Sequence, residues 1–169
     1  MQKLERVLGI LRSRELDCLA IFSASNILYI TSSDAPSAVL VFSGGEVVSL
    51  APRLEYLRAL EEVRVGEVLA YAKWGEPSEY ERLLQGDLYD AVRAVLQERG
   101  ARRVGAAGAS LEVRQKLSER LGTEVLDVSK EFQLLRRSKD REELKAMRAA
   151  VSVAEEAMRL AIDLSLIHI

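Results

Sequence analysis

Short apolar segments alternate with amphipathic segments along most of this chain, and this alternation limits the possible folds more than any other feature. The apolar segments, at residues 18–22, 38–42, 46–50, 68–71, 103–106 and 124–128, are too short for helices and have the composition of strands. Between them, residues 3–14, 53–60, 88–99 and 111–121 carry apolar side chains at helical spacing. The pattern predicts an α/β fold: a mixed sheet of about five or six strands with helices packed on it.

Local signals mark where several of these elements turn or end. The Ser-Gly-Gly sequence at residues 43–45 has the composition of a tight hairpin, so the strands on either side of it should be antiparallel neighbours. Ser110 is placed to cap a helix, and Gly100 and Gly122 are placed to end helices. The residues that we expect to point into helix-covered faces are Val39, Val41, Val48, Leu50, Val104 and Val125.

A long helix is predicted after the α/β region. Asp140 and Glu143 have the spacing of a capping box, and residues 134–138 lead into it. From residue 140 to 162, apolar positions alternate at spacings of three and four, which forms one continuous stripe along a helix. The positions are Leu144, Met147, Val151, Ala154, Met158 and Ala161. Such a stripe needs a partner, so we expect another part of a longer protein to cover it.

The last six residues have a different character. Residues 164–169, Leu-Ser-Leu-Ile-His-Ile, are what the DNA string CTGTCTCTTATACACATC encodes, the end of a transposon adapter used in library preparation. We interpret them as a cloning or sequencing scar. The expected organisation is therefore an α/β domain at 1–135, a linker helix at 136–163 that begins a further domain, and a non-native tail at 164–169.

The composition excludes several classes of protein. Hydrophobic residues make up 49% and charged residues 30% of 169 residues, and a net charge of -2 gives no electrostatic reason to bind nucleic acid. No apolar run approaches the roughly 20 residues of a membrane span, and the start alternates acidic and basic residues where a signal peptide would be apolar. We expect a cytoplasmic protein. The single Cys18 lies in a predicted strand, which favours burial over catalysis.

Two passages resemble a known family. Leu-Asp-Cys-Leu-Ala-Ile at 16–21, followed by Asn-Ile-Leu-Tyr-Ile-Thr at 26–31, resembles the creatinase-type N-terminal domain that precedes the pita-bread catalytic domain of Xaa-Pro dipeptidases (prolidases), aminopeptidases P and creatinases. Residues 50–55 and 103–105 continue the resemblance. Arg136, Lys139 and Glu143 match the family's R-x-x-K-s-x-x-E linker into the catalytic domain. The departure is at residues 32–34, Ser-Ser-Asp, where many members have glycine followed by an aromatic residue.

The resemblance implies a non-catalytic N-terminal domain of an Xaa-Pro metallopeptidase, with roles in dimerisation and active-site access. The parent enzyme would hold two divalent metal ions, Mn, Co or Zn, and this chain's partners would be its catalytic domain and a second subunit. A creatinase-like amidinohydrolase and a stand-alone interaction module are the alternatives. The only histidine, His168, lies in the tail, so this chain is expected to contain no catalytic or metal-binding residues.

The resemblance also indicates a candidate access loop, Thr31, Ser32, Ser33 and Asp34, because in related enzymes the N-terminal domain of one subunit approaches the active-site mouth of the other. A plain exposed loop is the alternative. For Asn26 and Tyr29 we favour structural roles, with Asn26 capping a short helical turn and the Tyr29 hydroxyl bonded to the backbone.

Two further features favour ordinary structural roles. Residues 105–108, Gly-Ala-Ala-Gly, lack a phosphate-binding pattern and read as a strand-to-helix turn. Tyr71, Trp74 and Pro77 could form an exposed aromatic patch for a subunit contact, but core packing is favoured.

Overall fold

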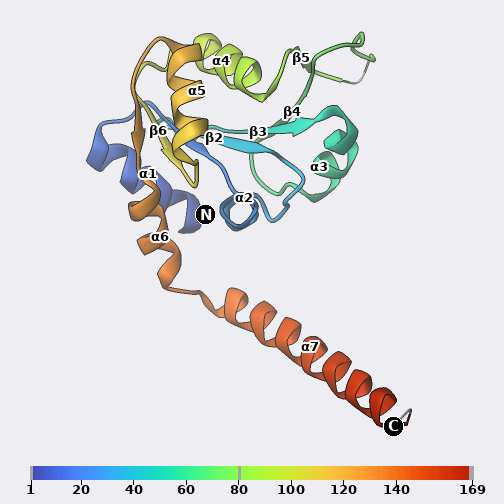
Figure 1. Cartoon of the computed structure of the whole chain (residues 1–169). Helices are drawn as coiled ribbons and strands as arrows, with labels where there is room; N and C mark the ends of the chain where they lie inside the picture. Colours follow the sequence, from blue (N-terminus) through green and yellow to red (C-terminus); the bar gives the residue numbers. More distant parts are fainter. Residues whose placement is uncertain (1, 80, 168–169) are drawn as a thin grey trace. The chain divides into compact units, whose positions relative to one another are not determined.

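The computed structural model describes residues 2–79 and 81–167 (Figure 1). The chain divides into two units, Met1–Leu135 and Arg136–Ile169. Unit 1 contains the sheet and most of the helices, and unit 2 contains the long C-terminal helix. Of the predicted tail, His168 and Ile169 lie outside the described residues.

A seven-stranded mixed sheet forms the centre of unit 1. Its strands, in chain order, are β1 (Cys18–Ile21), β2 (Ala38–Phe42), β3 (Val47–Pro52), β4 (Glu67–Ala72), β5 (Leu83–Gln85), β6 (Val104–Ala107) and β7 (Val125–Asp127). In space they follow the order β5-β4-β3-β2-β1-β6-β7. β2 pairs antiparallel with β1 and with β3, whereas the other neighbours are parallel. The predicted mixed α/β fold is confirmed, and β5 adds a strand that the sequence pattern did not indicate.

The predicted hairpin joins β2 and β3. Ala38 lies opposite Leu50 and Val41 lies opposite Val47, so the strands are antiparallel neighbours as expected. Gly45 adopts a φ of 92°, which glycine reaches without the strain that a Cβ atom would cause, and its N–H donates to the Phe42 carbonyl at 2.9 Å.

Helices cover both faces of the sheet. They are α1 (Gln2–Arg14), α2 (Ala24–Thr31), the short 3-10 helix η1 (Arg53–Glu55), α3 (Tyr56–Glu62), α4 (Leu88–Glu98), α5 (Leu111–Leu121) and α6 (Ser129–Arg137). Along β1, Cys18 and Ala20 pack in the core shared with α4 and α5, and Leu19 and Ile21 pack in the core shared with α1, α2 and α6. Strand alternation therefore builds two cores, one on each face of one sheet.

The predicted core residues are buried. Val39, Val41, Val48, Leu50, Val104 and Val125 are each at most 3% exposed, which confirms the expected orientation of these strands. Cys18 is also buried, and loss of solvation raises the pKa of its thiol far above the usual value, so it is held as a neutral thiol.

Two helices of unit 1 were not predicted as helices. Residues 26–31 were expected to follow a short capped turn, yet α2 has eight residues and begins after Ser23, whose side chain makes no capping hydrogen bond. Residues 134–138 were treated as a lead into the terminal helix, but they include the end of α6. Phe132 of α6 is fully buried, and Glu131 of α6 forms an ion pair with Arg14 of α1.

Caps and one carboxylate fix the ends of several elements. Ser110 caps α5 by accepting the Val113 N–H at 3.2 Å, and Gly122 ends that helix with a φ of 66°, both as predicted. Asp17 accepts the backbone N–H groups of Arg103 and Arg102 at 2.8 Å each. These bonds hold the pKa of Asp17 below its ordinary value and tie the start of β1 to the start of β6.

Unit 2 consists mainly of α7 (Arg141–Ile167). The predicted capping box is present: the Glu143 N–H donates to Asp140 at 2.8 Å, and the Asp140 N–H donates to Glu143 at 3.0 Å. The apolar stripe is exposed, as are most side chains of this helix. Within residues 2–79 and 81–167, no helix is both long enough and apolar enough to cross a membrane.

Candidate access loop

The candidate loop follows α2 and leads into β2. Ser32 directly follows α2 with a φ of 67°, and its N–H donates to the Leu28 carbonyl at 3.0 Å. This left-handed conformation closes the helix and is the one that glycine adopts most easily. A glycine here, which the resemblance leads us to expect in many family members, would fit this turn without the strain that the Ser32 side chain causes.

Thr31 and Ser33 turn inward and hold the loop. The Thr31 hydroxyl lies 2.9 Å from the Ile27 carbonyl and 2.8 Å from the Ser33 carbonyl, and it accepts the Ser33 N–H at 3.1 Å. The Ser33 hydroxyl accepts the Ala35 N–H at 3.1 Å. Both hydroxyl side chains are buried, so they are not available to a ligand at the surface.

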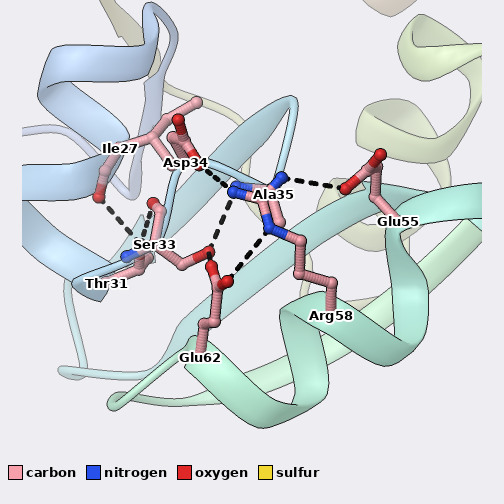
Figure 2. Close-up of polar contacts among 8 residues, drawn as sticks. All are labelled: Ile27, Thr31, Ser33, Asp34, Ala35, Glu55, Arg58 and Glu62. Atoms are coloured by element: carbon pink, nitrogen blue, oxygen red, sulfur yellow. Dashed lines mark hydrogen bonds and ion pairs between the residues drawn. The ribbon is translucent and has the colours of Figure 1, made fainter.

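Two residues of helix α3, Arg58 and Glu62, form polar contacts with the same loop (Figure 2). The Ser33 hydroxyl donates to Glu62 at 2.6 Å, and Arg58 donates to Glu62 at 3.0 Å. Arg58 also donates to Glu55 at 3.0 Å and forms an ion pair with Asp34. A single guanidinium thus joins the loop to η1 and α3.

The charges of this cluster stabilise one another. The hydrogen bond from Ser33, followed by that from Arg58, holds the pKa of Glu62 below its ordinary value. The hydrogen bonds to Glu62, Glu55 and Asp34 raise the pKa of Arg58. The guanidinium of Arg58 contacts three carboxylates, and the charge of Arg64 also acts on Glu62. All of these charged groups are partly exposed, so water screens each pair.

The structure therefore divides the four predicted access residues into two pairs. Thr31 and Ser33 are buried supports, and Ser32 and Asp34 are exposed on the loop surface. Sequence reasoning missed Arg58 and Glu62 as loop supports. Their signal was incomplete, because Glu55, Arg58 and Glu62 show a helical charge spacing but nothing in that spacing indicates Ser33 or Asp34.

The carboxylates of this cluster can be compared with the metal ligands that the resemblance implies for the parent enzyme. Across residues 2–79 and 81–167, no group of three or more His, Cys, Asp or Glu side chains could hold a metal ion. The three carboxylates around Arg58 are each occupied by a hydrogen bond from its guanidinium. These residues therefore do not fit the two-metal site that the resemblance implies for the parent enzyme.

Asn26 and Tyr29 lie in α2 and are buried, but not with the partners we expected. The expectation that Asn26 caps a turn is wrong, because Ser23 precedes the helix and Asn26 lies in its first turn, against Gly108. The Tyr29 ring packs edge-on against Phe132, with centroids 6.1 Å apart. Its hydroxyl has no hydrogen-bond partner within the described part of the chain, so the expected backbone bond is also wrong.

The linker residues make local contacts. Lys139 donates to the carbonyls of Arg136 and Arg137 at 2.8 and 3.2 Å, and Glu143 belongs to the capping box of α7. These contacts stabilise the end of α6 and the start of α7. The three motif residues, Arg136, Lys139 and Glu143, thus lie at or next to the end of α6 and the start of α7.

Trp74 lies on the loop between β4 and β5. Trp74 is 78% exposed, so the expectation of core packing is wrong for it, whereas Tyr71 is partly buried and donates to the Ser37 hydroxyl at 2.9 Å. Arg53 of η1 donates to the Glu76 carbonyl at 2.7 Å, which ties this loop to the turn that carries Leu54. Leu54 is 98% exposed.

Residues 105–108 form the end of β6 and the turn toward α5, as predicted.

Comparison with known proteins identifies the family to which this fold corresponds. The family described as the Creatinase/Prolidase N-terminal domain matches residues 3–138. A search of curated protein sequences returned no significant match.

Three solved structures illustrate the fold likeness. An Xaa-Pro dipeptidase from Bacillus anthracis is 17% identical with a TM-score of 0.77, and the alignment covers 97% of this chain and 43% of that one. A prolidase from Pyrococcus horikoshii is 18% identical with a TM-score of 0.71, covering 96% and 43%. The Creatinase/Prolidase N-terminal domain of an X-Pro dipeptidase from Streptococcus pyogenes is 15% identical with a TM-score of 0.58, covering 78% and 97%.

These identities show a shared fold, and the chain spans less than half the length of the first two proteins. The family match extends over unit 1 and the linker residues up to Ser138. This chain belongs to the creatinase/prolidase N-terminal domain family.

Proposed function

We propose that this chain is the non-catalytic N-terminal domain of an Xaa-Pro metallopeptidase, most similar in type to a prolidase, together with the linker helix that leads into the catalytic domain. The observation that carries the proposal is the family match over residues 3–138, followed directly by α7 with its exposed apolar stripe. In the proposed parent, two divalent metal ions, Mn, Co or Zn, are held by the catalytic domain and none by this chain.

The access role is assigned to the exposed part of the candidate loop. Ser32 and Asp34 point outward while Thr31, Ser33 and Arg58 fix the backbone beneath them. A loop that is held on both sides can limit the size of a peptide at a neighbouring active-site mouth, because it does not move aside at low cost. The exposed carboxylate of Asp34 would also favour substrates with a cationic amino terminus.

The dimerisation role is assigned to two exposed apolar side chains, Leu54 and Trp74. Arg53 joins the two segments that carry them. Large apolar side chains with this exposure mark contact surfaces in many proteins. We further propose that the parent works in the cytoplasm.

The test uses the complete gene product with substitutions in this domain. Asp34→Asn should raise KM for Xaa-Pro dipeptides several-fold with a smaller effect on kcat, and Ser32→Tyr should narrow the range of accepted peptide lengths. Glu61→Gln, on the same helix as Arg58 but outside the cluster, is the charge-matched control. If both loop variants keep the wild-type KM and the wild-type preference for peptide length, the proposed access role is wrong.

The two alternative parents, a creatinase-like enzyme and a non-catalytic homologue, differ from a prolidase in the substrate they hydrolyse or in the metal ligands they contain. A creatinase-like parent would hydrolyse an amidino substrate and leave Xaa-Pro dipeptides intact. A non-catalytic homologue would lack the metal ligands, two Asp, one His and two Glu, in its pita-bread domain and would show neither activity. Activity measured on both substrate classes distinguishes all three parents.

A further inference from the structure

Thr31, the last residue of α2, binds two segments that are far apart in the sequence. Its hydroxyl accepts the Ser33 N–H at 3.1 Å, and its carbonyl accepts the Arg64 N–H at 2.9 Å. Ser33 belongs to the candidate access loop, and Arg64 lies two residues after the end of α3. Thr31 is fully buried. One buried residue therefore attaches both the loop and the C-terminal end of α3 to the rest of unit 1.

The loop and α3 are also bound to each other. The Ser33 hydroxyl donates to Glu62 at 2.6 Å, and Arg58 pairs with Asp34 (Figure 2). Both Glu62 and Arg58 belong to α3. Movement of the loop alone, or of α3 alone, would break both contacts, whereas movement of the two segments together keeps them.

Little apolar packing opposes such a joint movement. Within the described residues, the core that the loop and α3 share is built of Ala35, Ala51 and Ala59, with Val63 and Val68 packed against it. The two larger cores contain leucine and phenylalanine side chains. Because an alanine side chain buries less apolar area than these, the small core contributes less to stability for each residue.

The leucines of α3 do not strengthen this core. Leu57 is 73% exposed and Leu60 is 47% exposed, while the buried residues of the helix are Tyr56 and Ala59. A helix of seven residues is also too short to be stable alone. α3 is therefore held to the sheet by one tyrosine, by small side chains and by polar contacts.

We propose that α3 and residues 32–35 form one flap, which opens from the sheet as a unit while the two larger cores stay folded, and that Thr31 is its latch. Segments with few buried apolar contacts are those that open locally in native proteins. The motion of the flap does not depend on the access role. Where the loop limits access, the flap determines what it costs to widen the entrance, because the loop moves only together with α3.

Hydrogen exchange of the 169-residue chain, resolved by residue with NMR, tests the flap. The ratio of the measured to the intrinsic exchange rate gives the equilibrium constant for opening at each amide. Four amides with hydrogen bonds in the flap or to its latch, at Ser33, Ala35, Val63 and Arg64, should share one opening constant within about threefold. The opening constant of Leu40, in the middle of β2, should be at least about tenfold smaller.

The first pair of variants tests the latch. Thr31→Val keeps the shape of the side chain and removes the hydroxyl, so it should raise the opening constants of Ala35 and Val63 together by about tenfold. Val63 is the informative amide, because its hydrogen bond runs to the Ala59 carbonyl within α3 and not to Thr31. Ser49→Ala is the control. It removes a buried hydroxyl that has no hydrogen-bond partner in the described part of the chain, and it should leave both opening constants unchanged.

The second pair of variants tests the link between the loop and the helix. Glu62→Ala removes the acceptor of the Ser33 hydroxyl, so the loop can open without α3. The opening constant of Ala35 should rise several-fold, while that of Val63 should stay within about twofold of wild type. Glu61→Ala, at the neighbouring exposed position of the same helix, is the matched control and should leave the two amides opening together. A common opening constant that persists in Glu62→Ala would show that this link does not join the segments.

Three further results would overturn the proposal. Opening constants of Ala35 and Val63 that differ by more than about tenfold in the wild-type chain would show that the loop and the helix open separately. Exchange of the flap amides only as slow as that of Leu40 would show that no local opening precedes global unfolding. Equal effects of Thr31→Val and Ser49→Ala would show that Thr31 is not the latch. The kinetics of the loop variants described above test the access role separately, so failure of one proposal leaves the other standing.

Discussion

Replacing Phe132 by alanine tests whether α6 is an integral part of the α/β domain. Phe132 is fully buried, packs edge-on against Tyr29, and lies in the core that α6 shares with α1 and α2. Truncation of a buried phenylalanine costs about 3–5 kcal/mol, because apolar contacts are lost and a cavity remains. Domains of this size are stable by about 5–15 kcal/mol, so Phe132→Ala should leave the fold marginal.

The assay is urea unfolding followed by circular dichroism, with thermal unfolding as a second measurement. A loss of about 4 kcal/mol corresponds to a fall in Tm of roughly 10–20 °C for a domain of this length. Leu134→Ala is the matched control, because Leu134 lies in the same helix and is 57% exposed. It should change stability by less than about 0.5 kcal/mol. Equal effects of the two substitutions would show that α6 does not pack on the domain through Phe132.

Four further substitutions test backbone geometry and charge. Gly66→Ala should cost at least about 2 kcal/mol, because Gly66 has a φ of 76° and a Cβ atom there would overlap the Val47 carbonyl, whereas Gly122→Ala, in open space at a φ of 66°, should cost about 1 kcal/mol in the same urea assay. Ser32→Gly should stabilise the chain by up to about 1 kcal/mol, since it relieves a left-handed residue; a loss of stability would contradict the assigned turn. Asp17→Asn should destabilise the chain by about 1 kcal/mol at neutral pH. Because the folded pKa of Asp17 is lowered, its contribution is complete above the unfolded value of 3.8 and is lost as the pH falls through the folded value, so the difference between wild type and variant should shrink on acidification. A difference independent of pH from neutral to strongly acidic solution would show that the charge of Asp17 is not involved.

The strands and long helices could be predicted because their signals are local. Apolar runs such as residues 38–42 fit only a strand, and Ser110 and Gly122 bound α5 through bonds to residues within four positions. The antiparallel hairpin followed from the two glycines between two strands. These features depend on backbone chemistry that neighbouring residues determine.

The unpredicted elements lack such signals. The three residues of β5 follow a polar loop and are stabilised by pairing with β4, which lies more than ten residues earlier. Helix α2 starts without a side-chain cap. Within α6, Phe132 is the one residue classed as buried, so its apolar face is too narrow to show in the sequence pattern.

The candidate loop was located by resemblance, and its supports depend on distant contacts. Ser33 and Glu62 are 29 positions apart, and Asp34 and Arg58 are 24 apart. No periodicity connects residues at such separations. Sequence reasoning therefore grouped Thr31, Ser32, Ser33 and Asp34 as one site, whereas folding buries two of them and exposes the other two.

The most direct test of the proposed function is hydrolysis of Xaa-Pro dipeptides by two proteins, the purified 169-residue chain and the complete gene product, each with Mn, Co or Zn. The account predicts no metal-dependent turnover by the 169-residue chain, since its described residues offer no cluster of metal ligands. It predicts turnover by the complete product. Metal-dependent activity that stays with the 169-residue chain through repurification, or a complete product with no activity on any Xaa-Pro peptide, would contradict it.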